Sequence, residues 1–347
     1  MKYSKVHLES MGYELAPIVV TSRELEDRLA AVYERLRISE GQLEAWTGIY
    51  ERRWWEPGYP LSKGAIAAAK KAIAASNVRP KDIDILVYGS VCREYFEPAT
   101  ACSVAASLGI SPDANIHDIS NACLGAVNGM IEIANSIELG QSRAGLVVSC
   151  ESAREINEST IKYILENPNM EKLIGSLTTF TGGSGASAIL LTDGSFSKPA
   201  RRRLLGGVTC AAPEFHEACR WGMEPKGDGT YVERARTDSL SILKNGVKLG
   251  SRTWEKFLKI LEWKSDQIDK LICHQVAAKN REVILETIGM PEEKDFSTYP
   301  YLGNIGTVSL PITAAIAEER DFLHAGEKVA FLGIGSGLNC LMLGWDW

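Results

Sequence analysis

Short apolar runs typical of β-strands alternate along the chain with segments whose apolar positions recur at helical spacing. Four of the strand-like runs stand out, at residues 83–87, 144–148, 268–272 and 329–333. The first and third each follow a helical pattern and a charged turn, and the other two each follow a charged residue. This alternation predicts an α/β architecture.

The four runs form two pairs that repeat at one offset. Residues 83 and 144 begin runs that match the runs beginning at 268 and 329, so each pair is 185 residues apart. Repetition at about half the chain length predicts a duplicated α/β unit, with two halves packed around a pseudo-twofold axis. We place these halves at residues 1–195 and 196–347.

The same offset pairs two helices that are rich in small side chains, one after Cys123 and one after Gly306. The first has apolar residues round much of its circumference, so we expect it to be buried and to end at Gly140. Small residues allow helices to approach closely, and we therefore expect the two helices to cross at the centre of the molecule.

Cys123 stands where the first of these helices begins. A helix N-terminus carries unpaired N–H groups that favour the thiolate, which is the nucleophilic form of a thiol. His274 closes one of the matched strands and Asn304 lies in the turn before the second helix, so both are expected near Cys123. Together the three residues predict a nucleophile site. Singly, each also fits a structural role, as a buried hydrophobe, a hydrogen-bonded histidine and a turn asparagine.

Composition narrows the class of protein. The chain has 347 residues, 45% of them hydrophobic, and a formal net charge of -6, which argues against a nucleic-acid surface. The basic run at 201–203 is expected to be a solvated loop, with a phosphate contact as the alternative.

The eight cysteines of the chain include no C-x-x-C pair, so neither a metal site nor a disulfide framework is expected. The N-terminus lacks an apolar signal segment and no run approaches the ~18 residues of a membrane span, which predicts a soluble cytoplasmic protein.

Six segments resemble the thiolase superfamily, and within it the ketoacyl-ACP synthase III branch. They are TGIYERR at 47–53, ACLG around Cys123, FTGGSGA at 180–186, HQ at 274–275, GN at 303–304 and GIGSG at 333–337. The resemblance spans nearly the whole chain. It implies a five-layered αβαβα fold with two duplicated halves, assembled as a homodimer.

The resemblance also implies a role for each candidate residue. Cys123 would accept the acyl group, and His274 and Asn304 would bind the carbonyl oxygen of a second thioester. The backbone N–H groups of Cys123 and Ser336 would form the oxyanion hole, where negative charge develops. Coenzyme A would carry the acyl substrates, with an acyl carrier protein as the alternative, and no other cofactor is implied. Downstream pathway enzymes are further candidate partners.

Two departures from ketoacyl-ACP synthase III bear on the reaction. Gln42 and Trp46 stand where the family has the Trp-x-x-x-Arg that stacks on the adenine of coenzyme A, so contacts to the coenzyme A head stay open. Glu97 stands where the family has an apolar or small residue. Its segment REYFEP resembles acyl-CoA-condensing enzymes of olefin biosynthesis, in which this glutamate enters the partner subunit's active site as a base. Glu97 also fits a helix start beside Pro98, where an acidic side chain is favoured.

These features predict a Claisen condensation of two medium- to long-chain acyl-CoA thioesters through an acyl-cysteine, giving a β-ketoacyl product or β-keto acid. A malonyl donor forms its carbanion by expelling carbon dioxide, whereas a non-malonyl thioester needs a base such as Glu97. An ordinary malonyl-using synthase of fatty acid or specialised metabolism is the alternative. A catalytically silent dimer partner is another, which the intact Cys123, His274 and Asn304 argue against.

Overall fold

The computed structural model describes residues 1–199 and 202–347. Its strands are β1 (His7–Leu15), β2 (Ile18–Thr21), β3 (Glu51–Trp54), β4 (Ile85–Gly89), β5 (Asn115–Ile119), β6 (Ala144–Glu151), β7 (Gly185–Thr192), β8 (Arg203–Ala211), β9 (Cys219–Pro225), β10 (Tyr231–Thr237), β11 (Lys270–Cys273), β12 (Lys328–Gly335) and β13 (Asn339–Asp346). Nine of them form one mixed sheet in the order β11-β12-β13-β8-β1-β7-β6-β4-β5, and β2-β3 and β9-β10 form separate pairs. One residue pair, His7 with Arg203, joins β1 to β8, so the sheet divides there into two halves.

Thirteen α-helices connect and cover these strands in the described part of the chain. They are α1 (Ser22–Arg28), α2 (Ala30–Leu36), α3 (Gln42–Thr47), α4 (Leu61–Ala74), α5 (Thr100–Leu108), α6 (Gly125–Glu138), α7 (Arg154–Glu166), α8 (Met170–Gly175), α9 (Leu177–Phe180), α10 (Ser239–Leu261), α11 (Ala278–Ile288), α12 (Tyr299–Leu302) and α13 (Ser309–Glu319). Short 3-10 turns lie at 80–82, 213–218, 265–267, 292–294 and 306–308. The mixture of helices with one large sheet confirms the predicted α/β class.

The four predicted strand-like runs are confirmed as β4, β6, β11 and β12. Each pair occupies the same place in its half, because β4 lies beside β6 and β11 lies beside β12, both in parallel. The single offset of 185 residues does not continue into the next strands. Residues 152–184 connect β6 to β7, whereas residues 336–338 connect β12 to β13. A long insertion in the first half therefore limits the repeat that the sequence reveals.

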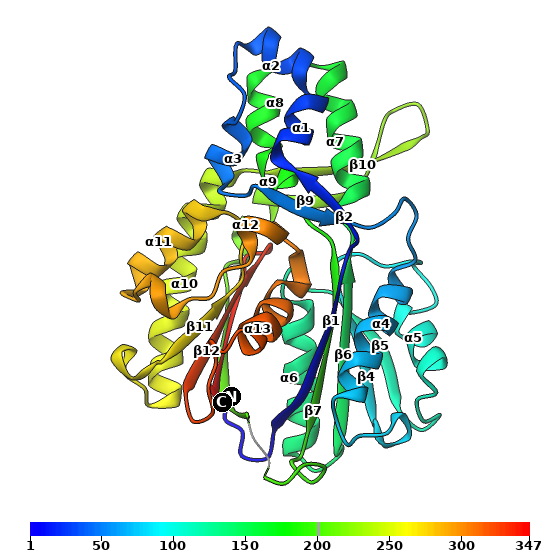
Figure 1. Cartoon of the computed structure of the whole chain (residues 1–347), viewed down its shortest axis with the longest axis vertical. Coiled ribbons are helices and arrows are strands. Elements are labelled where there is room, and N and C mark those ends of the chain that lie inside the picture. Colours follow the sequence, from blue (N-terminus) through cyan, green and yellow to red (C-terminus); the bar gives the residue numbers. More distant parts are fainter. Residues whose placement is uncertain (200–201) are drawn as a thin grey trace.

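Five layers stack across the molecule, as the resemblance implied (Figure 1). Helices α4 and α5 pack on the outer face of the first half, through a core that includes Val104. Helices α10 and α11 pack on the outer face of the second half, through a core that includes Phe257. Between the two inner faces lie α6 and α13, where Val127 and Ala314 belong to one core with strands of both halves. The thiolase-like architecture expected from the sequence is confirmed.

Helix α6 is buried over most of its surface, since eight of its 14 residues are buried, and Gly140 follows it with a φ of 71°. Its expected burial and its expected end are both confirmed. The two glycines of α6, however, lie against strands of the sheet and not against α13. A Cβ at Gly125 would stand 2.9 Å from the main chain of Gly89 in β4, and one at Gly129 would stand 3.0 Å from Val147 in β6. Glycine lets this central helix lie close to the strands.

A cap of smaller elements covers one end of the layered body and has a core of its own. It combines α1 to α3, the insertion α7 to α9 and the β9-β10 hairpin, at the top of Figure 1. Its core includes Leu25, Ile161 and Phe180. The cap covers the carboxyl ends of β4, β6 and β12. In α/β sheets, ligands bind at the carboxyl ends of the strands. This arrangement encloses a site at the sheet edge.

Two further observations concern the surface. Arg201 lies outside the described residues, whereas Arg202 pairs with Glu318 at 3.0 Å and Arg203 pairs with Asp346 at 3.8 Å. Arg203 is exposed as expected, although it begins strand β8 and does not lie in a loop, whereas Arg202 is only partly exposed beside its carboxylate. No helix in residues 1–199 and 202–347 is long and apolar enough to cross a membrane.

Candidate active site

Cys123 lies in a tight turn that ends where α6 begins, so its predicted position at a helix start is confirmed. Ala122 before it has a left-handed conformation with a φ of 46°, which is uncommon for a residue with a side chain. The amide of Leu124 donates to the carbonyl of Asn121 at 2.9 Å. The hydroxyl of Thr307 donates to the carbonyl of Ala122 at 3.1 Å. These contacts hold the strained turn, and strain of this kind is common at functional sites.

Cys123 lines a cavity of about 530 Å³ that lies under the cap. Asn304 and Ser336, from the second half of the chain, line the same cavity. The cap contributes residues from α7, α9 and the β9-β10 hairpin. The structure therefore brings Cys123, Asn304 and Ser336 together, whereas His274 and Glu97 are not among the lining residues of this chain.

Asn304 is held by main-chain hydrogen bonds on both sides. Its amide donates to the carbonyl of Thr181 at 2.8 Å, and its carbonyl accepts from the amide of Gly183 at 2.9 Å. Its side-chain Oδ1 accepts from the amide of Gly306 at 3.1 Å. Because Oδ1 is engaged within the chain, Nδ2 is the side-chain group that is left to donate to a carbonyl oxygen in the cavity.

His274 follows strand β11 and lies beside β12, where its amide donates to the carbonyl of Leu332 at 2.8 Å. Its side-chain Nδ1 is buried and has no hydrogen-bond partner among the described residues. Burial lowers the pKa of His274 to about 4, so the imidazole is neutral at physiological pH. A neutral imidazole both donates and accepts, which suits it to hold a carbonyl oxygen or to take up a proton.

The turn between β12 and β13 lies against the main chain of Cys123. A Cβ at Gly335 would stand 3.4 Å from the amide nitrogen of Cys123, and Ser336 is the next residue. The side-chain Nδ2 of Asn339 donates to Oδ1 of Asn121 at 3.0 Å and so joins this turn to the Cys123 turn. The two residues predicted to supply oxyanion donors therefore stand on adjoining turns.

The environment of Cys123 opposes ionisation of its thiol. Burial first, and then Glu151 and Cys219, raise the pKa of Cys123 to about 12. The predicted effect of the helix start is present, since a backbone N–H at Cys123 lowers the pKa, but loss of hydration outweighs it in this cavity. The thiol has to lose its proton as it attacks, which requires a proton acceptor within reach.

Glu97 is exposed in the loop between β4 and α5, outside the cavity of its own chain. Its neighbours Tyr95 and Phe96 are 65% and 99% exposed. Neighbouring large apolar side chains in water mark a surface that contacts another molecule. The arrangement fits a loop that enters a second subunit, and the role of Glu97 as a base in the partner's site stays a prediction.

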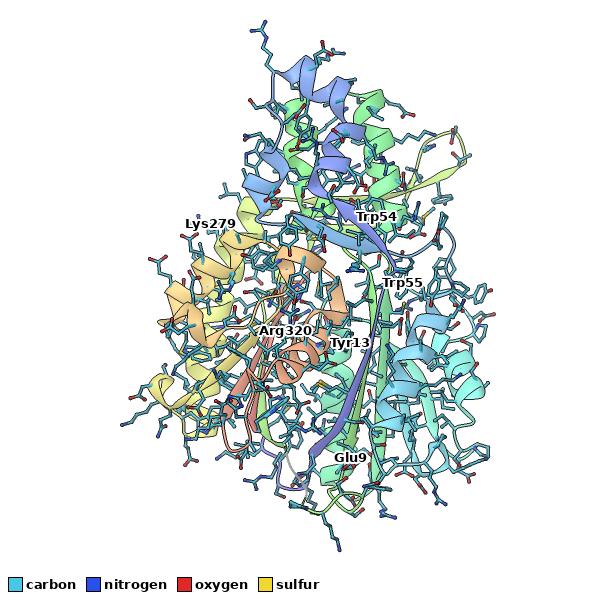
Figure 2. All side chains as sticks on the ribbon, viewed as in Figure 1. Glu9, Tyr13, Trp54, Trp55, Lys279 and Arg320 are labelled. Atoms are coloured by element: carbon cyan, nitrogen blue, oxygen red, sulfur yellow. The ribbon has the colours of Figure 1, made fainter. Side chains whose placement is uncertain are left out.

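Three of the sequence motifs meet beside Asn304. TGIYERR supplies β3, FTGGSGA leads into β7, and GN precedes the 3-10 turn before α13. The indole N–H of Trp54 donates to the carbonyl of Gly182 at 3.3 Å, and Figure 2 shows Trp54 where the cap meets the body. A Cβ at Gly183 would stand 2.0 Å from the carbonyl oxygen of Leu302, so only glycine fits where these loops touch. The motifs thus form the support of Asn304.

Glu151 is a candidate that the sequence analysis missed. It ends strand β6, is 4% exposed and lines the cavity with Cys123. Its Oε1 accepts from the amide of Val91 at 2.9 Å, and its Oε2 accepts from the amide of Cys92 at 3.2 Å. The signal was present in AGLVVSCE, where a carboxylate closes an otherwise uncharged strand. A search for polar residues at every strand end would have found it.

Comparison with known proteins places the chain in a family. The thiolase N-terminal domain matches residues 62–173, and the C-terminal domain of 3-oxoacyl-[acyl-carrier-protein] synthase III matches residues 258–347. A protein of Shewanella oneidensis named acyl-CoA:acyl-CoA alkyltransferase is 54% identical over 349 residues, a match that covers 100% of both chains. The chain belongs to the thiolase superfamily, in the family of these alkyltransferases. This thiolase-superfamily enzyme is therefore an acyl-transferring condensing enzyme.

Solved structures resemble this alkyltransferase-family enzyme over its full length. A cysteine-to-serine variant of OleA from Xanthomonas campestris, with bound lauric acid and lauroyl-CoA, is 32% identical with a TM-score of 0.92 and covers 99% of this chain and 100% of its own. A protein of Xanthomonas oryzae named 3-oxoacyl-(acyl carrier protein) synthase III is 33% identical with a TM-score of 0.93 and full coverage of both chains. The shared fold therefore accommodates relatives whose names imply two different reactions.

Proposed function

We propose that this enzyme joins two acyl-CoA thioesters by Claisen condensation without decarboxylation, through an acyl group on Cys123. The observation that carries the proposal is the cavity in which Cys123, Asn304 and Ser336 lie together. The name of the 54% identical relative supports acyl-CoA as both substrates. The lauric acid and lauroyl-CoA bound to OleA of X. campestris support medium- to long-chain acyl groups.

In the first step the sulfur of Cys123 attacks the carbonyl carbon of one acyl-CoA. The bond to the coenzyme A sulfur breaks, an acyl-cysteine forms, and the thiol proton leaves with coenzyme A. Neutral His274 is the proposed carrier of this proton, because its unprotonated imidazole has a nitrogen lone pair to accept it; with a pKa of about 4 it would pass the proton on at once to the departing coenzyme A thiolate. The amides of Cys123 and Ser336 would stabilise the negative charge that develops on the carbonyl oxygen.

In the second step another acyl-CoA places its carbonyl oxygen between His274 and Asn304. Their donors stabilise the enolate that forms when a base removes the α-proton. The α-carbon then attacks the acyl-cysteine, a carbon–carbon bond forms, and the sulfur of Cys123 leaves and regains a proton. The product is a β-ketoacyl-CoA, and hydrolysis of its thioester gives the β-keto acid.

The partner subunit's Glu97 is the proposed base, in a homodimer that completes each site with a residue from the other chain. The exposed aromatic residues beside Glu97 support a loop that is covered on assembly. Other structures of OleA from X. campestris carry changes at a glutamate or at a cysteine. Those two residues are as far apart along that chain as Glu97 and Cys123 are in this one.

We propose further that the enzyme acts in the cytoplasm and uses coenzyme A as the acyl carrier, with no other cofactor. All eight cysteines are unpaired thiols, which suits a reducing compartment. The name of the S. oneidensis relative supports coenzyme A over an acyl carrier protein. The division into halves 1–195 and 196–347 and contacts with downstream enzymes stay predictions.

A malonyl-using synthase is the second candidate, because the X. oryzae relative is named as one. Incubation of the purified enzyme with lauroyl-CoA alone separates the two reactions. A non-decarboxylative enzyme yields the β-keto acid, or the ketone that forms when this acid loses carbon dioxide. Product that appears only after addition of malonyl-CoA or malonyl-ACP would refute the proposal.

A catalytically silent partner predicts a third outcome in the same experiment. Mass spectrometry of the protein after exposure to lauroyl-CoA would then show no acyl mass on Cys123. The proposed mechanism requires that mass to appear in the wild type and to be absent in Cys123→Ser.

A further inference from the structure

Glu151 connects the cavity of Cys123 to the loop that carries Glu97. Both of its carboxylate oxygens accept amides at the root of this loop, from Val91 at 2.9 Å and from Cys92 at 3.2 Å. Its main-chain carbonyl accepts the indole N–H of Trp55 at 3.0 Å. The residue is therefore fixed at its backbone and at its carboxylate.

The loop at residues 91–98 is anchored at its root and exposed at its tip. Besides the two bonds to the carboxylate, the carbonyl of Cys92 accepts from the hydroxyl of Tyr88 at 2.8 Å. The side chain of Glu94 accepts from the amide and the hydroxyl of Ser62 at 2.9 and 2.7 Å. The next four residues along the chain are exposed. The direction of the tip therefore depends on contacts at the root.

The same carboxylate faces the nucleophile. Besides Cys123, the titratable or charged residues that line the cavity are Glu151, Cys219 and Arg220. Arg220 pairs at 2.7 Å with Glu217, which is not among the residues that line this cavity. The charge of Glu151 adds to burial in raising the pKa of Cys123. Glu151 thus raises the pKa of Cys123 in its own chain and also binds the root of the 91–98 loop.

We propose that Glu151 is a positioning residue for condensation, which holds the root of the 91–98 loop so that Glu97 reaches the cavity of the partner subunit. This inference rests on the proposed function, because it takes Glu97 to be the base. Glu151 is not itself assigned as the base, since each of its oxygens already accepts a backbone N–H.

The test compares Glu151→Gln with Glu97→Ala and with the double variant. Glutamine keeps the size of the side chain but cannot accept two amides in the same way. We expect Glu151→Gln to gain the acyl mass on Cys123 normally while condensation of lauroyl-CoA slows about 10-fold or more. Because Glu151 acts through Glu97, the double variant should condense no more slowly than Glu97→Ala. Glu286→Gln, at an exposed carboxylate in α11, is the matched control.

The pH dependence of Cys123 alkylation by iodoacetamide gives a readout that loss of structure alone would not produce. Removal of a negative charge beside the thiol should move the profile of Glu151→Gln to lower pH. Glu97→Ala and Glu286→Gln should leave the profile unchanged. Glu151→Asp keeps the charge but shortens the arm, so it should keep the wild-type profile and lose condensation.

Two results would overturn the inference: wild-type condensation in Glu151→Gln, or a double variant slowed by the product of the two single losses. If Glu151→Gln shows no cooperative thermal unfolding, Glu151→Asp carries the test by the same criteria. Failure of the proposed function would be seen in the wild type itself, which would then make no product from lauroyl-CoA alone. The alkylation profile would still report on the charge of Glu151 in that case.

Discussion

The side chain of Asn339 donates a 3.0 Å hydrogen bond to Asn121, which lies 218 positions earlier in the chain. Asn121 in turn donates through Nδ2 to Oδ1 of Asn128 in α6 at 2.7 Å. This row of amides joins the turn that holds Ser336 to the turn that holds Cys123. The relative position of the two proposed oxyanion donors therefore depends on side chains as well as on strand pairing.

Asn339→Ala is expected to slow both acylation of Cys123 and condensation, each by about 10-fold, because displaced donors stabilise an oxyanion less well. Single-turnover mass spectrometry measures the first step, and steady-state product formation measures both. Asn77→Ala, at an exposed asparagine, should leave both rates unchanged. Normal acylation combined with slow condensation would contradict a role in the oxyanion hole.

Alkylation of Cys123 by iodoacetamide should rise about tenfold per pH unit up to pH 10, with no plateau. The reason is that a thiol with a pKa of about 12 stays protonated throughout this range, and only its small thiolate fraction reacts. Peptide mass spectrometry follows the reaction, and Cys123→Ser supplies the background from exposed Cys102. A plateau below pH 9 would show that the resting thiol is already ionised.

His274 should make the folded protein less stable as the pH falls from 7 to 5. Its folded pKa of about 4 lies below the ordinary value of 6.5, so the unfolded chain binds a proton that the folded chain excludes. The loss in unfolding free energy from this residue is about 2 kcal/mol at pH 5 and grows until the pH passes the folded pKa. Thermal unfolding at both pH values should show a smaller loss in His274→Asn, and equal losses would exclude this linkage.

Glu97→Ala should accept an acyl group at Cys123 and fail to condense, with a loss of about 10²-fold or more. If the base acts across subunits, mixing Glu97→Ala with Cys123→Ser should restore activity, because each mixed dimer then has one complete site. Random mixing predicts about a quarter of the wild-type rate. Glu286→Ala, at an exposed carboxylate in α11, is the control. No recovery in demonstrably mixed dimers would place the base in its own subunit.

Gly183→Ala should destabilise the protein by about 3 kcal/mol or more and reduce condensation, because its Cβ would stand 2.0 Å from the carbonyl oxygen of Leu302. Denaturant unfolding measures the first effect. Gly175→Ala is the matched control, since nothing lies within 4 Å of its added Cβ and alanine favours a helix. Similar stability of the two variants would show that the loops can separate at no cost.

The parts of the fold that depend on local periodicity could be predicted from the sequence. Apolar runs and an offset repeat indicated β4, β6, β11 and β12 correctly, and apolar residues round its circumference indicated a buried α6. Cys123 and Asn304 were singled out because they stand at the ends of such elements, and both line one cavity in the structure. Positions that follow from element boundaries are therefore accessible to sequence reasoning.

The remaining features depend on contacts between distant segments. The charge that bears on Cys123 comes from Glu151, which a different strand brings to the cavity, so the elevated thiol pKa was not foreseeable from the start of α6. Likewise Gly125 and Gly129 face strands rather than α13, because a helix between two sheets meets strands on both sides. Such effects need the packed structure, since they depend on which surfaces meet.

The connections after the matching strands β6 and β12 differ greatly in length, and the two halves of the chain contribute different parts of the site. In the half with the three-residue connection at 336–338, β12 pairs directly with β13, and Ser336 in this connection is one of the two proposed oxyanion donors. The half with the longer connection at 152–184 contributes α7 to α9, which share a core with α1 to α3 in the cap. Substitutions in α7 to α9 can change the space available to acyl chains without changing Cys123, Asn304 or Ser336. New substrate preferences can therefore arise while the reacting groups stay the same.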